Sequence, residues 1–227
     1  MATVMTPADH DRVAEAIAAA EGATSGEIFA VVETRPASYP RTAFTVAVLA
    51  SFALPLAAVL IAGLDPRMLP FDNGWSSGDG FTDIVRAIEA YAAAQALIFV
   101  AVLALVGRTA LARKLTPRAV RTARVHRLAM SQFLSHGLHV TAERTGVLLF
   151  LSLPDHVAEV IADEGIYTKV DKAVWDETVG ALIAGAKRGA PGEGFAQAVA
   201  VAGRVLAEHF PPRADNPNEL PDRLIEL

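Results

Sequence analysis

An uncharged apolar run from Ala43 to Leu64 constrains this chain more than any other feature of its sequence. A second such run, from Tyr91 to Gly107, follows after one polar segment. An α-helix rises about 1.5 Å per residue and the hydrocarbon core of a bilayer is about 30 Å thick, so roughly 20 apolar residues cross it. The first run has that length, and the second reaches it when Ile88 is included. We expect two transmembrane helices, at about 43–64 and 88–107; the alternative is a pair of buried helices in a soluble core.

The charges near these two runs predict their orientation in a membrane. Positive residues lie on the outer sides of the pair: Arg35, Arg41, Arg108, Arg113, Lys114, Arg118, Arg121 and Arg124. The segment between the runs has only Arg67 and Arg86, and its other charges are acidic. Lysine and arginine close to a membrane are retained on the cytoplasmic side. We therefore expect a multi-pass protein of the cell inner membrane with both termini in the cytoplasm and a short non-cytoplasmic loop.

Composition narrows the possible partners and chemistry. The chain contains no cysteine, which excludes disulfides, thiolate metal sites and cysteine catalysis. A net charge of -5 argues against a nucleic-acid partner. The basic helix that begins near Arg118 predicts contact with the lipid bilayer, since basic residues beside a cytoplasmic leaflet each gain about 1 kcal/mol from anionic lipid. The alternative is a solvated helix face that only signals topology.

The segment before the first run begins a folded domain that it cannot complete. Thr6 and Pro7 predict a helix N-terminus, with the helix running to about Ala20. Residues 27–34 are apolar and branched in the middle, which is typical of a strand buried on both faces. A buried strand needs neighbouring strands, and the only chain long enough to supply them follows the second run. We therefore expect one domain that a membrane hairpin interrupts.

The segment after the second run supplies the missing elements. The pattern predicts helices at about 116–136, 170–188 and 194–209 and an antiparallel hairpin of strands at 146–153 and 157–163. We predict an α/β fold in which a small mixed β-sheet is flanked by helices as an α/β/α sandwich. Residues 1–41 and 110–213 would form this split domain, 42–109 the transmembrane hairpin, and 214–227 an acidic C-terminal tail that is flexible or lies on the surface.

Several short motifs, in this order along the chain, carry a family resemblance. They are TSGEI at 24–28, TAERTGVLLF at 141–150, IADEGI at 161–166, Trp175, HFP at 209–211 and NELPD at 218–222. Together they resemble the TPM-domain family, also called TPM phosphatase-like, and the chain is similar to a membrane-anchored bacterial member with a hairpin inserted in the domain. The resemblance implies the α/β/α sandwich, binding of a divalent cation, usually calcium, and a weak acid phosphatase activity in some members. The motif positions are Ser25, Gly26, Arg144, Gly146, Gly165 and Trp175.

Acidic residues of these motifs form the candidate metal site. In an antiparallel hairpin, Glu143 would lie beside Asp163 and Glu164. A first strand parallel to the second would bring Glu27 to the same edge of the sheet. Oxygen ligands of this kind suit Ca²⁺ or Mg²⁺, which would neutralise their mutual repulsion. Arg144 is a competing source of that neutralisation, and solvated charges at loop ends are the alternative.

Three functions remain open from the sequence. The first is a binding or assembly-accessory module that acts on an unknown protein partner in a membrane complex, because this function needs no residue that the chain lacks. The alternative is a divalent-cation-dependent phosphatase-like hydrolase, and the third is a domain that only stabilises the hairpin. The histidines form no HExxH motif, and Ser25 has no GxSxG context, so the sequence leaves catalysis undecided and catalytic residues unassigned.

Overall fold

The computed structural model describes residues 5–64, 80–140, 144–213, 218 and 220–227. The chain divides into two compact units, one formed by Met1–Ala37 with Arg118–Leu227 and the other by Ser38–Pro117. The first unit is therefore built from both ends of the chain.

The first unit contains a mixed sheet of four strands in the order β3-β2-β1-β4. The strands are β1 (Glu27–Glu33), β2 (Gly146–Ser152), β3 (Val157–Ala162) and β4 (Leu224–Glu226). β1 runs parallel to both β2 and β4, and β2 runs antiparallel to β3. The register pairs Glu27 with Gly146 and Glu33 with Ser152. The predicted pairing of the first strand with residues beyond the second apolar run is confirmed, as is the antiparallel hairpin.

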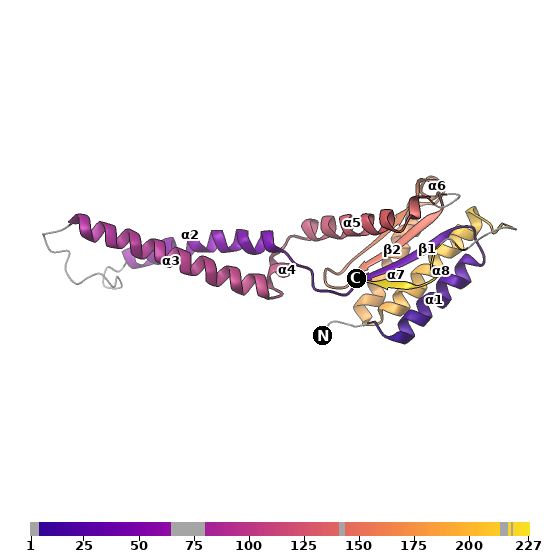
Figure 1. Cartoon of the computed structure of the whole chain (residues 1–227), viewed down its shortest axis with the longest axis horizontal. Coiled ribbons are helices and arrows are strands. Elements are labelled where there is room, and N and C mark those ends of the chain that lie inside the picture. Colours follow the sequence, from indigo (N-terminus) through magenta and orange to yellow (C-terminus); the bar gives the residue numbers. More distant parts are fainter. Residues whose placement is uncertain (1–4, 65–79, 141–143, 214–217, 219) are drawn as a thin grey trace. The chain divides into compact units, whose positions relative to one another are not determined.

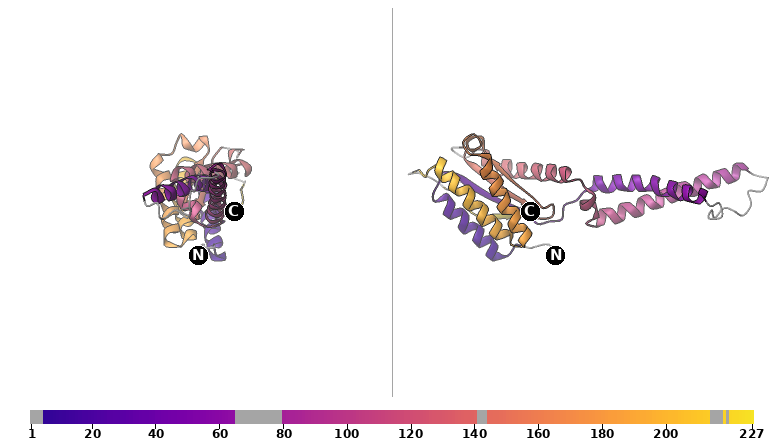
Figure 2. Two further views of the ribbon diagram at one scale, coloured as in Figure 1. Left: turned by 90° about the vertical axis from the view of Figure 1, so that its left-hand side faces the viewer. Right: turned by 180° about the vertical axis from the view of Figure 1, so that it is seen from behind.

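Helices cover both faces of this sheet. They are α1 (Pro7–Glu21), α5 (Arg118–Ser135), α6 (Glu164–Tyr167), α7 (Lys172–Arg188) and α8 (Pro191–His209), with a 3₁₀ turn, η2 (Leu138–Val140). Ile28, Ala30 and Val32 pack toward α1, α7 and α8, whereas Phe29 and Val31 pack toward α5. Figure 1 shows α5 on one side of the strands and the other three long helices on the opposite side, and the reverse view in Figure 2 shows the same layers from behind. This mixed α/β arrangement has the predicted layers.

Local sequence signals explain where the helices begin and end. Thr6 and Asp9 form a capping box before α1, because the Thr6 hydroxyl accepts from the Asp9 N–H and Asp9 accepts from the Thr6 N–H. α7 begins at Lys172, two residues after the predicted start, because Asp171 caps it by accepting from the Ala173 N–H. α8 begins at Pro191, three residues before the predicted start, since proline suits the first turn of a helix.

Glycines set the close approach of α7 and α8. A Cβ atom on Gly185 would lie 2.4 Å from the Gly194 Cα. The helices can pack at this distance only because neither residue has a side chain there. The buried line of α7 is accordingly Trp175, Thr178, Leu182 and Gly185. The apolar side chains of Val179, Ile183 and Ala186 on the same helix are only half-buried.

The second unit is helical. It contains α2 (Pro40–Leu64), α3 (Gly80–Arg108) and the short α4 (Leu111–Leu115). Phe44 and Phe99 meet edge to face with ring centroids 5.7 Å apart, and Thr116 donates to the Thr42 hydroxyl at 2.8 Å. Pro40–Ile61 and Ile88–Arg108 are long and apolar enough to cross a membrane, with mean hydropathies of 2.4 and 2.2.

The exposure of these two helices distinguishes them from core helices of a soluble protein. Only 17% and 6% of their most apolar windows are buried, whereas a soluble core helix is mostly buried. Large apolar side chains such as Leu49, Phe52, Leu60 and Leu97 are more than half exposed. The predicted loop between the helices includes residues 65–79, which lie outside the described residues.

The end of the chain differs from the sequence prediction. Residues 214–227 were expected to form a tail on the surface or free in solution, but Leu224–Glu226 forms the edge strand β4. The Leu227 N–H donates to the Val32 carbonyl at 2.9 Å, and the Thr34 N–H donates to the Leu227 carbonyl at 3.1 Å. These bonds extend the sheet beyond β1 and bury Leu224.

Candidate functional site

The motifs of the predicted carboxylate site meet at one end of the strands, where β1 and β2 begin and β3 finishes. The Glu27 N–H donates to the Thr145 carbonyl at 3.1 Å, and the Asp163 N–H donates to the Gly146 carbonyl at 3.0 Å. The Thr145 hydroxyl donates to the Ser25 carbonyl at 3.1 Å. The backbone segments around Ser25, Thr145 and Asp163 therefore lie together, as the parallel and antiparallel pairings require.

The carboxylates at this end of the strands do not gather into one group. Glu27 is buried and accepts from the Leu220 N–H at 3.2 Å. Asp163 caps α6 by accepting from the Glu164 N–H at 2.6 Å, and its other oxygen, Oδ2, is buried without a hydrogen-bond partner. The side chain of Glu164 is 81% exposed and lies 3.9 Å from Arg144. Each described carboxylate has a separate environment, so the convergence expected of Glu27, Asp163 and Glu164 is not found.

The metal prediction therefore depends on Glu143. Among the described residues, no three or more histidine and acidic side chains form a group that could hold a metal ion. Glu143 lies outside those residues, so its position relative to Asp163 stays a prediction. The sequence offered a cation or Arg144 as the positive charge that offsets these carboxylates. Arg144 lies in contact with one of them, Glu164.

The other motif positions have structural roles. Ser25 is buried, and its N–H donates to the Phe210 carbonyl at 2.9 Å. A Cβ atom on Gly146 would lie 2.5 Å from the Leu138 carbonyl oxygen, so only glycine fits there. Gly26 packs against Leu206 less tightly, because a Cβ atom there would lie 3.2 Å from the leucine methyls, which can shift. These residues form a tight entry into the sheet. Trp175 is buried in the core, and Gly165 lies half-buried in α6.

A second acidic group lies between the end of α1 and the C-terminal segment. The Glu21 Oε1 accepts from the Ile28 N–H at 2.8 Å, and the carboxyl group also hydrogen-bonds to Asp222. Burial raises the pKa of Glu21 to about 9, and the nearby carboxylates of Glu27 and Asp222 contribute to the rise. In its protonated form Glu21 can accept from the Ile28 N–H and donate to Asp222. No signal in the sequence marks this group, because a glutamate in a last helical turn is usually solvated.

A buried ionic network lies at the other end of the strands, where β1 and β2 finish. Arg124 Nη1 lies 3.0 Å from Glu33 Oε2 and 2.9 Å from Asp155 Oδ2. The Ser152 hydroxyl donates to Glu33 Oε2 at 2.6 Å. The side chains of Glu33 and Asp155 are 6% and 0% exposed, so Arg124 supplies a positive charge where water is excluded. The sequence placed Arg124 on the exposed basic face of this helix, and that prediction is wrong. Arg124 points into the fold and fixes α5 to the ends of β1 and β2.

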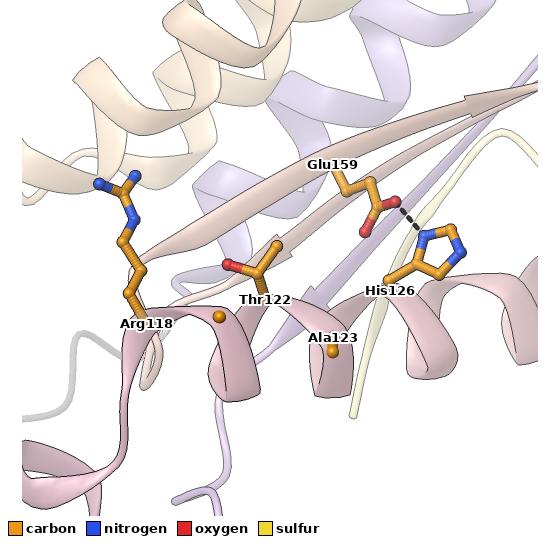
Figure 3. Close-up of a pocket in the computed structure, with 6 residues that line it drawn as sticks. Arg118, Thr122, Ala123, His126 and Glu159 are labelled. Carbon is orange, nitrogen blue, oxygen red and sulfur yellow. Dashed lines mark hydrogen bonds and ion pairs between the residues drawn. The ribbon is translucent and has the colours of Figure 1, made fainter.

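A surface hollow of about 600 Å³ lies between α5 and β3. Its lining residues are Arg118, Ala119, Thr122, Ala123, His126 and Glu159. Figure 3 shows Arg118, Thr122 and His126 projecting from α5 on the side of the strand that carries Glu159. His126 Nδ1 bonds to Glu159 Oε1, which fixes both side chains at one end of the hollow. The hollow thus combines small side chains with the charged side chains of Arg118 and Glu159.

No model of a known protein family matches the chain, and no curated protein matches it. Among solved structures, the chain is similar to the NMR structure of the BA42 protein from the psychrophilic bacterium Bizionia argentinensis sp. nov.. The match has a TM-score of 0.55 and 19% sequence identity, and it covers 98% of this chain and 94% of the other. This likeness concerns the fold alone.

Proposed function

We propose that this chain is a TPM-like integral membrane protein whose α/β unit is a binding or assembly-accessory module for a membrane complex. The observation that carries the proposal is the position of the two apolar helices between β1 and β2, which are neighbouring parallel strands of one sheet. A sheet that forms on one side of a membrane needs both of its flanking segments on that side. A hairpin of two spans satisfies this requirement, whereas a single span does not.

The orientation of the module follows from charge. Arg41 precedes the first apolar helix, and Arg108, Arg113 and Lys114 follow the second. Positive residues at the ends of transmembrane helices favour the cytoplasmic side of the inner membrane. On α5, Arg118 and Arg127 are exposed, so they are the residues of this helix that remain suited to anionic lipid.

A binding role fits the described site better than a hydrolytic one. A metal-dependent phosphatase needs a cation that positions a water or polarises a phosphoryl oxygen. The described carboxylates at the predicted edge are instead engaged with the Leu220 N–H, the Glu164 N–H and Arg144. The module also presents an open hollow at α5 and β3, which is the surface that we assign to a partner.

Accessibility labelling in intact cells tests the topology. The natural chain has no cysteine, so Ser76→Cys and Thr168→Cys each introduce one thiol. A membrane-impermeant maleimide should label Ser76→Cys in intact cells and Thr168→Cys only after the membrane is permeabilised. Equal labelling of both thiols in intact cells would contradict the proposed topology.

Cation titration tests the choice between a binding module and a hydrolase. We expect no saturable change in tryptophan fluorescence or melting temperature when Ca²⁺ or Mg²⁺ is added up to millimolar concentration to the full chain in detergent. A saturable shift that both Glu143→Gln and Asp163→Asn abolish would instead favour the hydrolase.

Partner capture then provides the positive test: crosslinking from the α5–β3 hollow in cells should trap a defined membrane protein or a second copy of the chain.

A further inference from the structure

The outer edge of the sheet at β3 carries unpaired backbone groups. β3 follows β2 at one end of the strand order, and no described element continues the sheet beyond it. The Asp163 N–H bonds to the Gly146 carbonyl, so residues 157, 159 and 161 bond to β2 in the alternating ladder. The intervening residues Ala158, Val160 and Ala162 therefore direct their N–H and C=O groups away from β2.

This edge has few of the features by which folded proteins prevent edge pairing. Natural edge strands are usually short, or they carry lysine, proline or a bulge. β3 has six residues in unbroken register with β2 and contains neither lysine nor proline. Its single charge, Glu159, bonds to His126 on α5 and so lies over a face of the sheet, not along its edge. The opposite edge strand, β4, has only three residues.

We propose that β3 is a dimerisation edge, at which β3 of a second copy of this chain adds in antiparallel register. A two-fold axis through Val160 places Val160 of each copy opposite the other and pairs Ala158 with Ala162 of the second copy. The outward-directed groups then meet as hydrogen-bonded pairs, which joins two four-stranded sheets into one. The small side chains at 158 and 162 leave room for this approach on the face that α7 covers.

Charge along the edge favours this antiparallel arrangement over a parallel one. The start of β3 lies beside basic groups, because Arg121 bonds to the Asp155 carbonyl and Arg118 lies one helical turn earlier on α5. The end of β3 is followed by Asp163 and Glu164. In the two-fold arrangement, the acidic residues that follow β3 of the second copy are brought toward the start of β3, on the side of Arg118. The exposed pair of Glu164 with Arg144, at 3.9 Å, is a weak competitor for this contact.

Hollows on both faces of the sheet flank the same edge. On one face, the hollow between α5 and β3 has a volume of about 600 Å³. On the other, a hollow of about 240 Å³ is lined by Ala158, Val160 and Ala162 together with Trp175 and Tyr167. Side chains of an added strand alternate between the two faces, so each hollow can receive side chains from the second copy. This inference concerns the α/β unit alone and does not depend on the proposed function.

Site-specific crosslinking of the full chain in detergent tests the register. Because the natural chain has no cysteine, each variant carries a single thiol. Val160→Cys should link to itself through a short bismaleimide, since paired residues lie about 5.5 Å apart at their Cα atoms. Ala158→Cys should not link to itself, because four residues of offset separate the two thiols by about 13 Å. A mixture of Ala158→Cys and Ala162→Cys chains should link.

A proline variant tests whether the edge holds the dimer. Val160→Pro removes only an outward N–H and leaves the bonds to β2 intact, a position at which edge strands tolerate proline. The loss of both symmetry-related hydrogen bonds should weaken dimerisation by on the order of tenfold or more. Light scattering in detergent measures the mass, and circular dichroism checks that the secondary structure is unchanged. If Val160→Pro does not fold, charge exchange decides: Arg118→Glu and Glu164→Arg should each weaken the dimer, and their combination should restore it.

Four results would overturn the proposal. They are a monomer at all concentrations, a dimer that persists in folded Val160→Pro, equal self-linking at positions 158 and 160, and charge exchange without effect. A dimer that persists in Val160→Pro would assign association to another surface such as the apolar helices. A monomer in which Val160→Cys links to a different protein would assign the edge to that partner.

Discussion

Replacing Glu21 by glutamine should stabilise the protein at neutral and alkaline pH. Glu21 has a pKa of about 9 in the folded chain against 4.5 as a free side chain, so the folded state binds an additional proton between these two pH values. Stability that the neutral carboxyl provides is complete below pH 4.5 and is lost as the pH rises toward 9. Glutamine keeps an Oε1 that accepts from the Ile28 N–H and gains an amide that donates to Asp222. The substitution thus retains the contacts of the protonated acid and removes its titration.

The magnitude follows from linkage. Each pH unit in this interval removes about 1.4 kcal/mol at most, so the ceiling at pH 7.5 is about 4 kcal/mol. Glu21 is only partly buried, and solvent screening reduces the expected gain to about 1–2 kcal/mol. For a unit of this size the melting temperature should rise by about 2–8 °C.

The assay is thermal unfolding of the full chain in detergent, followed by tryptophan fluorescence from pH 5 to pH 9. The melting temperature of the natural protein should fall relative to that of Glu21→Gln as the pH rises. Glu15→Gln, on the exposed face of the same helix, is the matched control and should follow the natural protein. If Glu21→Gln also follows it across the whole range, Glu21 is ionised in the folded state and the reasoning is refuted.

Three further changes test the packing and charge of the α/β unit by the same melting assay. Arg124→Leu should destabilise it by about 3–5 kcal/mol, because Glu33 and Asp155 would remain buried without their cation; a loss below 1 kcal/mol would show that water reaches the network. Gly185→Ala should lower the free energy of unfolding by about 1–3 kcal/mol, because the added methyl forces α7 away from α8. Gly180→Ala is the control: nothing lies within 4 Å of its Cβ position, so it should be neutral or stabilising by up to about 1 kcal/mol. Equal effects of the two substitutions would contradict the close helix packing. Thr6→Ala should cost about 1 kcal/mol through loss of the α1 cap, and Thr6→Ser should retain most of that stability.

Periodicity and turn chemistry predicted most of the α/β unit, because its long elements carry strong local signals. The capping box at Thr6, the buried strand at 27–33 and the hairpin at 146–162 are all encoded by adjacent residues. The pairing of β1 with residues beyond the second apolar run also followed, since a buried strand with no early neighbour must pair with later ones; the parallel direction was only a condition from the crossover connection, and the structure has it. β4 was missed because three residues in an acidic segment carry no periodicity, and the strand exists only through bonds to β1.

The site was less predictable, because it depends on which side chains meet across the sheet. Arg124 looked like one of several surface arginines, and its role depends on Glu33 and Asp155, which lie far from it in sequence. Glu21 gave no signal in its own segment. For Glu27, Asp163 and Glu164 the sequence predicted the correct edge of the sheet, but it could not predict that the Leu220 N–H, the α6 N-terminus and Arg144 would each engage a different carboxylate.

The pairing of β1 with β2 also determines when the sheet can form during synthesis. Ile28 pairs with Val147, which lies 147 − 28 = 119 positions later in the chain. At about 5–20 residues per second, the ribosome needs roughly 6–24 s to supply that partner. For this interval β1, which is buried along its whole length in the final fold, has no neighbouring strand. The nascent chain therefore carries an aggregation-prone segment through the entire production of both apolar helices, and its folding yield should depend on chaperones that shield residues 27–33 until β2 emerges.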